Sequence, residues 1–150
     1  MWTLTVDNLN ILNTINNPSF AVKKGSDVQT LSSNTHTKVT FDTELFDSNN
    51  NFASSRFTPT VAGQYYFCAD LHHYNSANAA TTIRNTALYK NGSVHTHTLR
   101  TENSSPGYTI KVEVSAIIEM NGTTDYVEVY ASDQGLHGGD WSHFAGHLLG

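Results

Sequence analysis

The chain has 150 residues, 14% of them charged, and its formal net charge at pH 7 is -5. This length suits one domain around a single core, and the acidic balance argues against nucleic-acid binding through a basic face. No run of roughly 18 apolar residues occurs, so we expect no membrane insertion. With Cys68 as the only cysteine, no intrachain disulfide can form.

Residues 1–17 differ in pattern from the rest of the chain. Their apolar residues occur among Asn and Thr, first in alternation and then at helical spacing. An isolated chain would expose these groups, so we expect a connecting stalk or collar that meets its copies in an oligomer. Pro18 ends the segment, because a proline pushes the residue before it toward extended conformations. We therefore place one domain over residues 18–150.

The domain shows strand signals separated by loops rich in Ser, Asn and Asp. In the segment FTPTVAGQYYF, Phe57 opens a strand and a sharp corner follows before Gly63. Asn91-Gly92 predicts a tight hairpin turn, because both central positions of that turn need positive φ. Strands are predicted over residues 19–22, 38–41, 57–67, 81–90, 93–100, 110–120 and 126–131. This series without a convincing long helix predicts an all-β sandwich.

The cleanest alternation of apolar and polar residues lies between Ile110 and Met120. It predicts a half-buried strand with one face toward the core. Ile117 breaks the pattern, since it stands among the polar positions. Its place on that face suggests contact with a neighbouring subunit.

The spacing of one set of residues resembles the signature of the complement C1q-like globular head, a family that belongs with the tumour necrosis factor jelly rolls. The set is Phe41, Asp47, Phe52, Phe57, Gly63, Tyr65 and Phe67. The segments ALYKNGS and FAGHLL resemble the hairpin and the closing strand of the family, whereas Ala69 replaces a usual aromatic residue. The resemblance implies a jelly-roll β-sandwich of about ten antiparallel strands that assembles as a homotrimer.

A homotrimer of this kind packs aromatic and aliphatic side chains around its threefold axis, as the resemblance implies. The aromatic candidates for that interface are Tyr65, Tyr66, Phe67, Tyr126 and Tyr130. A place in the core of a single protomer is an equal alternative for each of them. The sequence pattern alone does not choose between the two positions.

Two groups of residues are candidate metal ligands. His95 and His97 share one face of a predicted strand, and three copies at a threefold axis would present six imidazoles to a transition metal, as in some viral fibres. Asp133 and Asp140 lie on a Gly-rich segment that could bind calcium in a loop, as some heads of the resembled family do. A solvated strand or loop is the alternative in each case.

The expected function is noncatalytic, because no nucleophile elbow, phosphate-binding glycine loop or His-Glu-x-x-His motif occurs. We expect a trimeric recognition head that binds a cell-surface protein or glycan. Contact is expected in the loops 49–54, 72–80, 102–108 and 132–141, through the aromatic residues Tyr74, Tyr108 and Trp141.

The expected setting is extracellular or on a virion surface. The Asn- and Thr-rich beginning and the lack of a collagen period favour the tip or decoration of a viral fibre. The alternatives are a purely structural trimerisation module of a fibre and a secreted lectin-type head.

Overall fold

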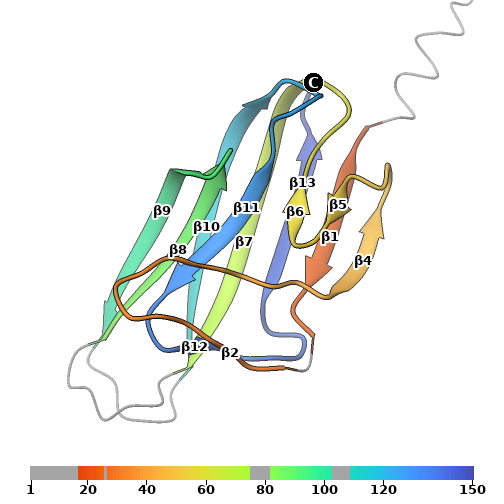
Figure 1. The fold of residues 1–150 in the computed structure, drawn as a ribbon. Coiled ribbons are helices and arrows are strands. Elements are labelled where there is room, and N and C mark those ends of the chain that lie inside the picture. Colours follow the sequence, from red (N-terminus) through yellow and green to blue (C-terminus); the bar gives the residue numbers. More distant parts are fainter. Residues whose placement is uncertain (1–16, 26, 75–81, 103–108) are drawn as a thin grey trace, which may run out of the picture.

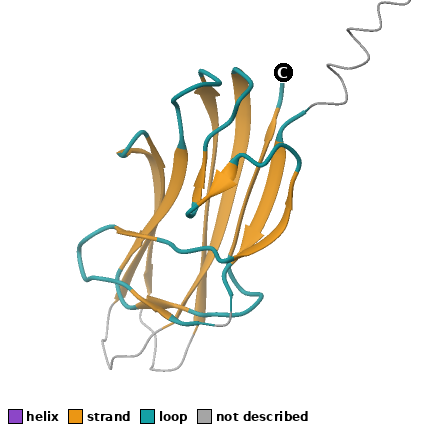
Figure 2. Cartoon of the chain, turned by 45° about the vertical axis from the view of Figure 1, so that its right-hand side comes forward, coloured by secondary structure: helices purple, strands orange, loops and turns teal. Residues whose placement is uncertain are grey.

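The computed structural model describes residues 17–25, 27–74, 82–102 and 109–150, and every regular element in them is a strand (Figure 1 and Figure 2). The strands are β1 (Ser19–Lys23), β2 (Gln29–Thr30), β3 (Thr37–Lys38), β4 (Thr43–Asp47), β5 (Phe52–Ala53), β6 (Arg56–Phe57), β7 (Gly63–Tyr74), β8 (Thr82–Lys90), β9 (Ser93–Glu102), β10 (Thr109–Met120), β11 (Val127–Ser132), β12 (Gly135–Leu136) and β13 (His143–Leu148). The described residues include no helix long and apolar enough to span a membrane.

The strands form two sheets that pack face to face (Figure 2). The seven-stranded sheet has the order β2-β12-β7-β13-β1-β4. The seventh strand, β10, pairs with β7 along its whole length, on the side opposite β13. The six-stranded sheet has the order β5-β6-β11-β8-β9, with β3 also paired to β11. Each pair is antiparallel. The predicted all-β sandwich is therefore confirmed.

Alternation along the two longest strands sends every second side chain into the space between the sheets. On β7, the residues at odd positions, such as Tyr65 and Phe67, are fully buried, whereas their even-numbered neighbours are only half-buried. On β10, Val112 and Val114 are buried and Glu113 between them is exposed. One face of each strand is thus committed to the core and the other is left outside.

Phenylalanine rings from four strands meet at the centre of the core. The ring of Phe20 stacks on Phe57, with centroids 4.3 Å apart, and meets the edge of Phe144 at 4.9 Å. Phe67 lies 6.1 Å from Phe144. Such aromatic pairs add stability beyond the area that they bury. These contacts join both sheets through β1, β6, β7 and β13.

Gly146 on β13 leaves the space that two of these rings occupy. A Cβ atom at this position would lie 2.6 Å from the Phe67 ring and 2.9 Å from the Phe20 ring. We expect Gly146→Ala to destabilise the fold by about 1–3 kcal/mol, because overpacking moves buried side chains from their preferred rotamers. Urea unfolding measures this loss. An unchanged unfolding midpoint would contradict the tight packing described for these rings.

The predicted turns have different causes. Asn91 and Gly92 have φ values of 52° and 78°, so the β8–β9 hairpin has the expected positive-φ turn. In the β10–β11 connection only Gly122 has positive φ, and the side-chain oxygen of Asn121 accepts backbone hydrogen bonds from Thr123, Thr124 and Asp125. The Asn121 side chain therefore stabilises the β10–β11 turn by accepting backbone hydrogen bonds.

The predicted strand over residues 38–41 is wrong for most of its length. Only Thr37 and Lys38 pair with β11, and the chain then crosses from one sheet toward the other (Figure 1). Along this crossing, Val39 donates a backbone bond to the Val129 carbonyl, and the amide of Phe41 donates to Ser55 Oγ. The crossing anchors its apolar side chains in the core without a regular ladder.

The first and last described residues lie together at one end of the sandwich (Figure 1). There the amide of Leu148 donates to the Pro18 carbonyl at 3.0 Å. The stalk expected over residues 1–17 lies almost wholly outside the described residues. At the opposite end, β7 finishes at Tyr74 beside β12. We call this opposite end the distal end.

Candidate subunit interface

The outward face of the seven-stranded sheet carries side chains in rows that the strand registers align. In one row, Ala21 pairs with Phe46 and Ala145, and Cys68 pairs with Ala145 and Ser115. We call this the small-residue row, since most of its members are small. It crosses five strands of the sheet.

A second row is more aromatic and lies farther from the distal end. His147 pairs with Ser19 and Tyr66, and Tyr66 pairs with Ile117 on β10. The rings of Tyr66 and His147 lie 5.8 Å apart. We call this the aromatic row. Paired residues on one face of a sheet have adjacent side chains, so the row presents a continuous surface.

Two large apolar side chains on these rows are open to solvent in the single chain. Ile117 is 58% exposed and Phe46 is 51% exposed. Scattered exposed apolar residues are ordinary, but an aligned apolar surface marks a site of interaction. The low charge of both rows adds to that character, since neither row contains Asp, Glu, Lys or Arg. This face can therefore receive another protein surface.

A charged band borders the two rows on the side of the distal end. Asp70 accepts from Lys111 at 3.2 Å and lies 3.3 Å from His143 Nδ1, and Lys111 also contacts Glu113 at 2.8 Å. Hydrogen bonds with Glu113 and Asp70 raise the pKa of Lys111. Lys23 forms a further ion pair with Asp140. The band can fix the orientation of a partner by charge.

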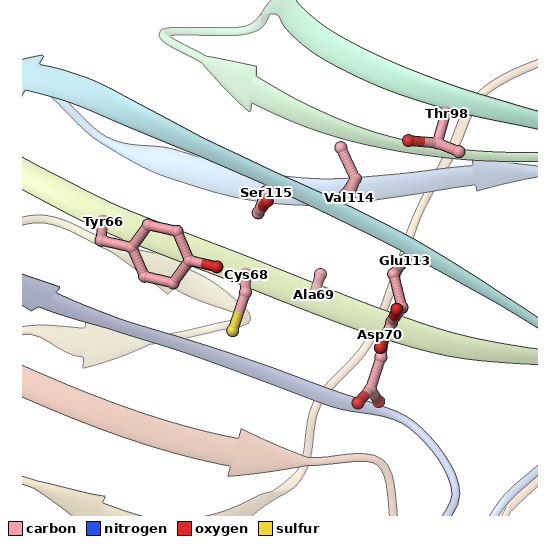
Figure 3. A pocket seen from close by; sticks show the side chains of 8 residues that line it. All are labelled: Tyr66, Cys68, Ala69, Asp70, Thr98, Glu113, Val114 and Ser115. Atoms are coloured by element: carbon pink, nitrogen blue, oxygen red, sulfur yellow. The ribbon is translucent and has the colours of Figure 1, made fainter.

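A pocket of about 400 Å³ lies where the charged band meets the rows (Figure 3). Tyr66, Cys68 and Asp70 line it from β7, and Glu113 and Ser115 line it from β10. Burial and the neighbouring carboxylates raise the pKa of the Cys68 thiol. A raised pKa keeps the thiol protonated and poorly nucleophilic. The pocket is thus suited to receiving a side chain rather than to covalent chemistry.

The interface candidates from the sequence occupy different parts of the fold. Tyr65 and Phe67 have no exposed surface and lie in the core, the alternative that was open for them. Tyr65 donates its hydroxyl to the Val61 carbonyl, and burial raises its pKa to about 12. Their side chains are therefore not part of the surface of the single chain. Tyr66 is the β7 aromatic that faces outward.

Tyr126 and Tyr130 lie on the other side of the sandwich, on the outward face of the six-stranded sheet. The Arg56 guanidinium lies over the Tyr126 ring at 3.8 Å. Tyr130 stacks on Tyr89, with ring centroids 4.0 Å apart. Both tyrosines are partly exposed. They do not share a surface with Tyr66.

The metal-ligand candidates do not converge in the single chain. His95 and His97 are exposed on β9, an edge of the six-stranded sheet, and His95 is the unpaired residue of a β-bulge. Asp133 accepts the amide of Asn34, whereas Asp140 pairs with Lys23. Among the residues that the structure describes, no three His, Cys, Asp or Glu side chains are grouped to hold a metal ion.

Two of the three predicted ligand-contact residues meet at the distal end. His137 bridges them, because its ring lies 5.3 Å from Tyr74 and 5.8 Å from Trp141. His72 adds a contact with Trp141 at 5.4 Å. Trp141 is 53% exposed, so the cluster offers an aromatic surface. We call His72, Tyr74, His137 and Trp141 the distal aromatic cluster. The third predicted residue, Tyr108, lies outside the described residues.

Sequence reasoning missed the residues that complete the outward face. Ala21, Phe46 and Ala145 gave no signal, because their importance depends on the pairing of distant strands. His147 likewise gave no signal for an interface. The alternation around Ile117 and the aromatic residue Tyr66 were the sequence signals that pointed to this face.

Comparisons with known proteins agree with this architecture. The family model described as the C1q domain matches residues 19–149. Among solved structures, the globular domain of the zebrafish complement 1qA protein is 18% identical, with a TM-score of 0.65 over 89% of this chain and 98% of that chain. Murine APRIL at pH 5.0 is 9% identical, with a TM-score of 0.66 over 89% and 100% of the two chains.

A third solved structure, the Eiger tumour necrosis factor of S. frugiperda, is 9% identical, with a TM-score of 0.69 over 89% of this chain and 93% of that chain. No curated protein matched the chain. At these identities the structural likenesses show the fold, and they confirm the predicted jelly roll.

Proposed function

Because the chain belongs to the C1q domain family, we propose that it forms a noncatalytic homotrimeric head that recognises a cell-surface protein or glycan. Domains of this family are generally noncatalytic, and the homotrimer is their typical assembly. We propose an extracellular or virion-surface location, at the tip of a viral fibre or as a decoration. A structural trimerisation module and a secreted lectin-type head are the alternatives.

The observation that supports assembly is the uncovered outward face of the seven-stranded sheet. Its small-residue row and aromatic row align apolar side chains, and Ile117 is more than half exposed at their edge. A second copy of this chain is the occupant that we propose for this face. Three copies arranged in a closed ring would cover every such surface, whereas a single chain leaves it in water.

The surface that we propose for ligand contact is the distal aromatic cluster. Tyr74 and Trp141 lie at the end of the sandwich opposite to the first and last described residues. A head joined to a fibre through residues before Ser19 would present this end outward. Exposed aromatic rings can stack on sugars or anchor a protein partner.

Binding to an array of glycans and cell-surface proteins tests recognition. We expect retention of the wild-type protein on at least one class of partner, and about tenfold or greater loss for the Ile117→Asp variant, because one site replaces three linked sites. Trp141→Ala tests the distal aromatic cluster and should weaken retention without changing assembly. A trimeric wild type that binds nothing on the array would favour the structural trimerisation module.

A further inference from the structure

Two cationic side chains converge on one buried carboxylate at the outward side of the six-stranded sheet. Lys38 Nζ and Arg56 Nε lie 2.6 Å and 2.8 Å from the same oxygen, Oε1 of Glu128. The Glu128 side chain is only 3% exposed, whereas the Lys38 and Arg56 side chains are 32% and 43% exposed. Two positive charges against one negative charge leave a local excess of one, in a chain whose net charge is -5.

The Arg56 guanidinium is held in place and keeps donors to spare. Its Nε donates to Glu128, and its plane lies over the Tyr126 ring at 3.8 Å. Within the described residues the guanidinium contacts Glu128 and Tyr126, and these contacts leave its two terminal amino groups available. A guanidinium fixed in this way matches the paired oxygens of a carboxylate or a sulfate.

A pocket of about 520 Å³ adjoins these cations. None of the residues that line it is acidic. Its polar lining residues include Lys38, Arg56, Asn50, Ser54, Thr58 and Thr60. Hydroxyl and amide groups of this kind hydrogen-bond the hydroxyl groups of a sugar ring. The pocket thus combines a positive charge with neutral hydrogen-bonding groups.

Internal hydrogen bonds preform the rim of the pocket. The side-chain oxygen of Asn51 accepts the amide of Thr60 at 3.1 Å, which ties two stretches of the rim together. Ser55 accepts the amide of Phe41 at 2.9 Å, which ties the β5–β6 turn to the crossing segment. A rim fixed before binding lowers the entropy that a ligand must lose on binding.

We propose that this pocket binds an acidic saccharide, with the carboxylate or sulfate against Arg56 and Lys38. The inference rests on the proposed recognition function, because it names a ligand class for the head. The pocket lies on the six-stranded sheet, away from the outward face proposed for assembly. A trimer in which this pocket stays uncovered would present three of them, and a branched or polymeric acidic glycan could then engage more than one.

Calorimetric titration with matched sugars tests the proposal. Glucuronic acid and galactose 6-sulfate are the acidic probes, and glucose and galactose are their neutral counterparts. We expect at least about tenfold tighter binding of an acidic probe than of its neutral counterpart, because a hydrogen-bonded charge contributes more than a neutral group. Inorganic sulfate and acetate, titrated alone, distinguish a saccharide site from an anion site.

Two variants and a control locate the site. Arg56→Gln removes the guanidinium. Ala53→Tyr places a larger side chain in the pocket lining while the charged groups of Lys38, Arg56 and Glu128 remain. Each should reduce binding by about tenfold or more. Lys90→Gln is the control, because it removes a lysine from a separate ion pair with Asp125 at 2.9 Å. Ala53→Tyr keeps the test valid if Arg56→Gln unfolds.

The outcomes separate this proposal from the one on which it rests. Binding of an acidic saccharide that both pocket variants weaken and Lys90→Gln preserves supports the pocket. Equal binding by the pocket variants, no binding of either acidic probe, or equally tight binding of sulfate or acetate alone overturns it. A trimer that recognises a neutral glycan or a protein on the array would keep the recognition function while this pocket is rejected.

Discussion

Replacing Ile117 with Asp is expected to convert the proposed trimer to a monomer. Ile117 pairs with Tyr66 in the aromatic row, and its side chain is 58% exposed in the single chain. In the proposed assembly the new carboxylate would lose its water without gaining a cation. Burying an unpaired charge costs several kcal/mol, and the threefold symmetry repeats the cost at each interface. Sedimentation equilibrium measures the resulting mass.

Ile83→Asp is the matched control for that substitution. Ile83 is also an isoleucine on a strand and is 49% exposed, but it lies on β8 in the six-stranded sheet. We expect this variant to remain trimeric. If both variants stayed trimeric, or if Ile83→Asp alone dissociated, the outward face of the seven-stranded sheet would not be the interface.

Replacing Phe144 with Ala is expected to cause the largest loss of folding stability. The Phe144 ring is fully buried and contacts four other phenylalanines, namely Phe20, Phe41, Phe52 and Phe67. Truncation removes apolar contacts and leaves a cavity among rings that both sheets hold in place. The free energy of unfolding should fall by about 3–5 kcal/mol. Urea unfolding in the Ile117→Asp background measures this without a contribution from subunit dissociation.

Phe46→Ala provides the comparison for the core substitution. The same side chain is lost, but Phe46 is 51% exposed on the outward face. In the Ile117→Asp background we expect a loss below about 1 kcal/mol, as is usual for exposed positions. In the wild-type background the same substitution should weaken assembly, because Phe46 belongs to the small-residue row. Similar losses for Phe46→Ala and Phe144→Ala would contradict the core described here.

Local patterns predicted the strands best where one face is buried and the other is polar. The stretch from Ile110 to Met120 alternates cleanly, and it forms β10 with the expected buried positions. The hairpin at Asn91-Gly92 was also predictable, because its backbone conformation is a local requirement of two residues. Residues 38–41 were harder, since their apolar side chains are buried without a regular ladder.

The orientation of β7 is only weakly marked in its residues. Tyr65, Tyr66, Phe67 and Cys68 are all apolar or aromatic, and only the flanking Gln64 and Asp70 indicate that Tyr66 and Cys68 face outward. The structure shows Tyr65 and Phe67 in the core and Tyr66 outside. A strand whose two faces are both covered loses its polar alternation. The weak alternation of β7 is what we expect if another copy covers its outward face.

The rows on the outward face depend on register, which connects residues far apart in sequence. Cys68 meets Ala145 and Ser115 only because β13 and β10 flank β7 in one particular alignment. The cation pair on Glu128 has the same origin, since Lys38 and Arg56 reach it from two different strands. No local pattern in the sequence identifies such partners.

Native mass spectrometry of the purified wild-type chain tests the central claim most directly. Assembly through the outward face predicts a species of three times the mass of the chain, which persists on dilution. A monomer at micromolar concentration would contradict the proposed trimeric head. It would leave the jelly-roll fold intact but remove the basis for multivalent recognition.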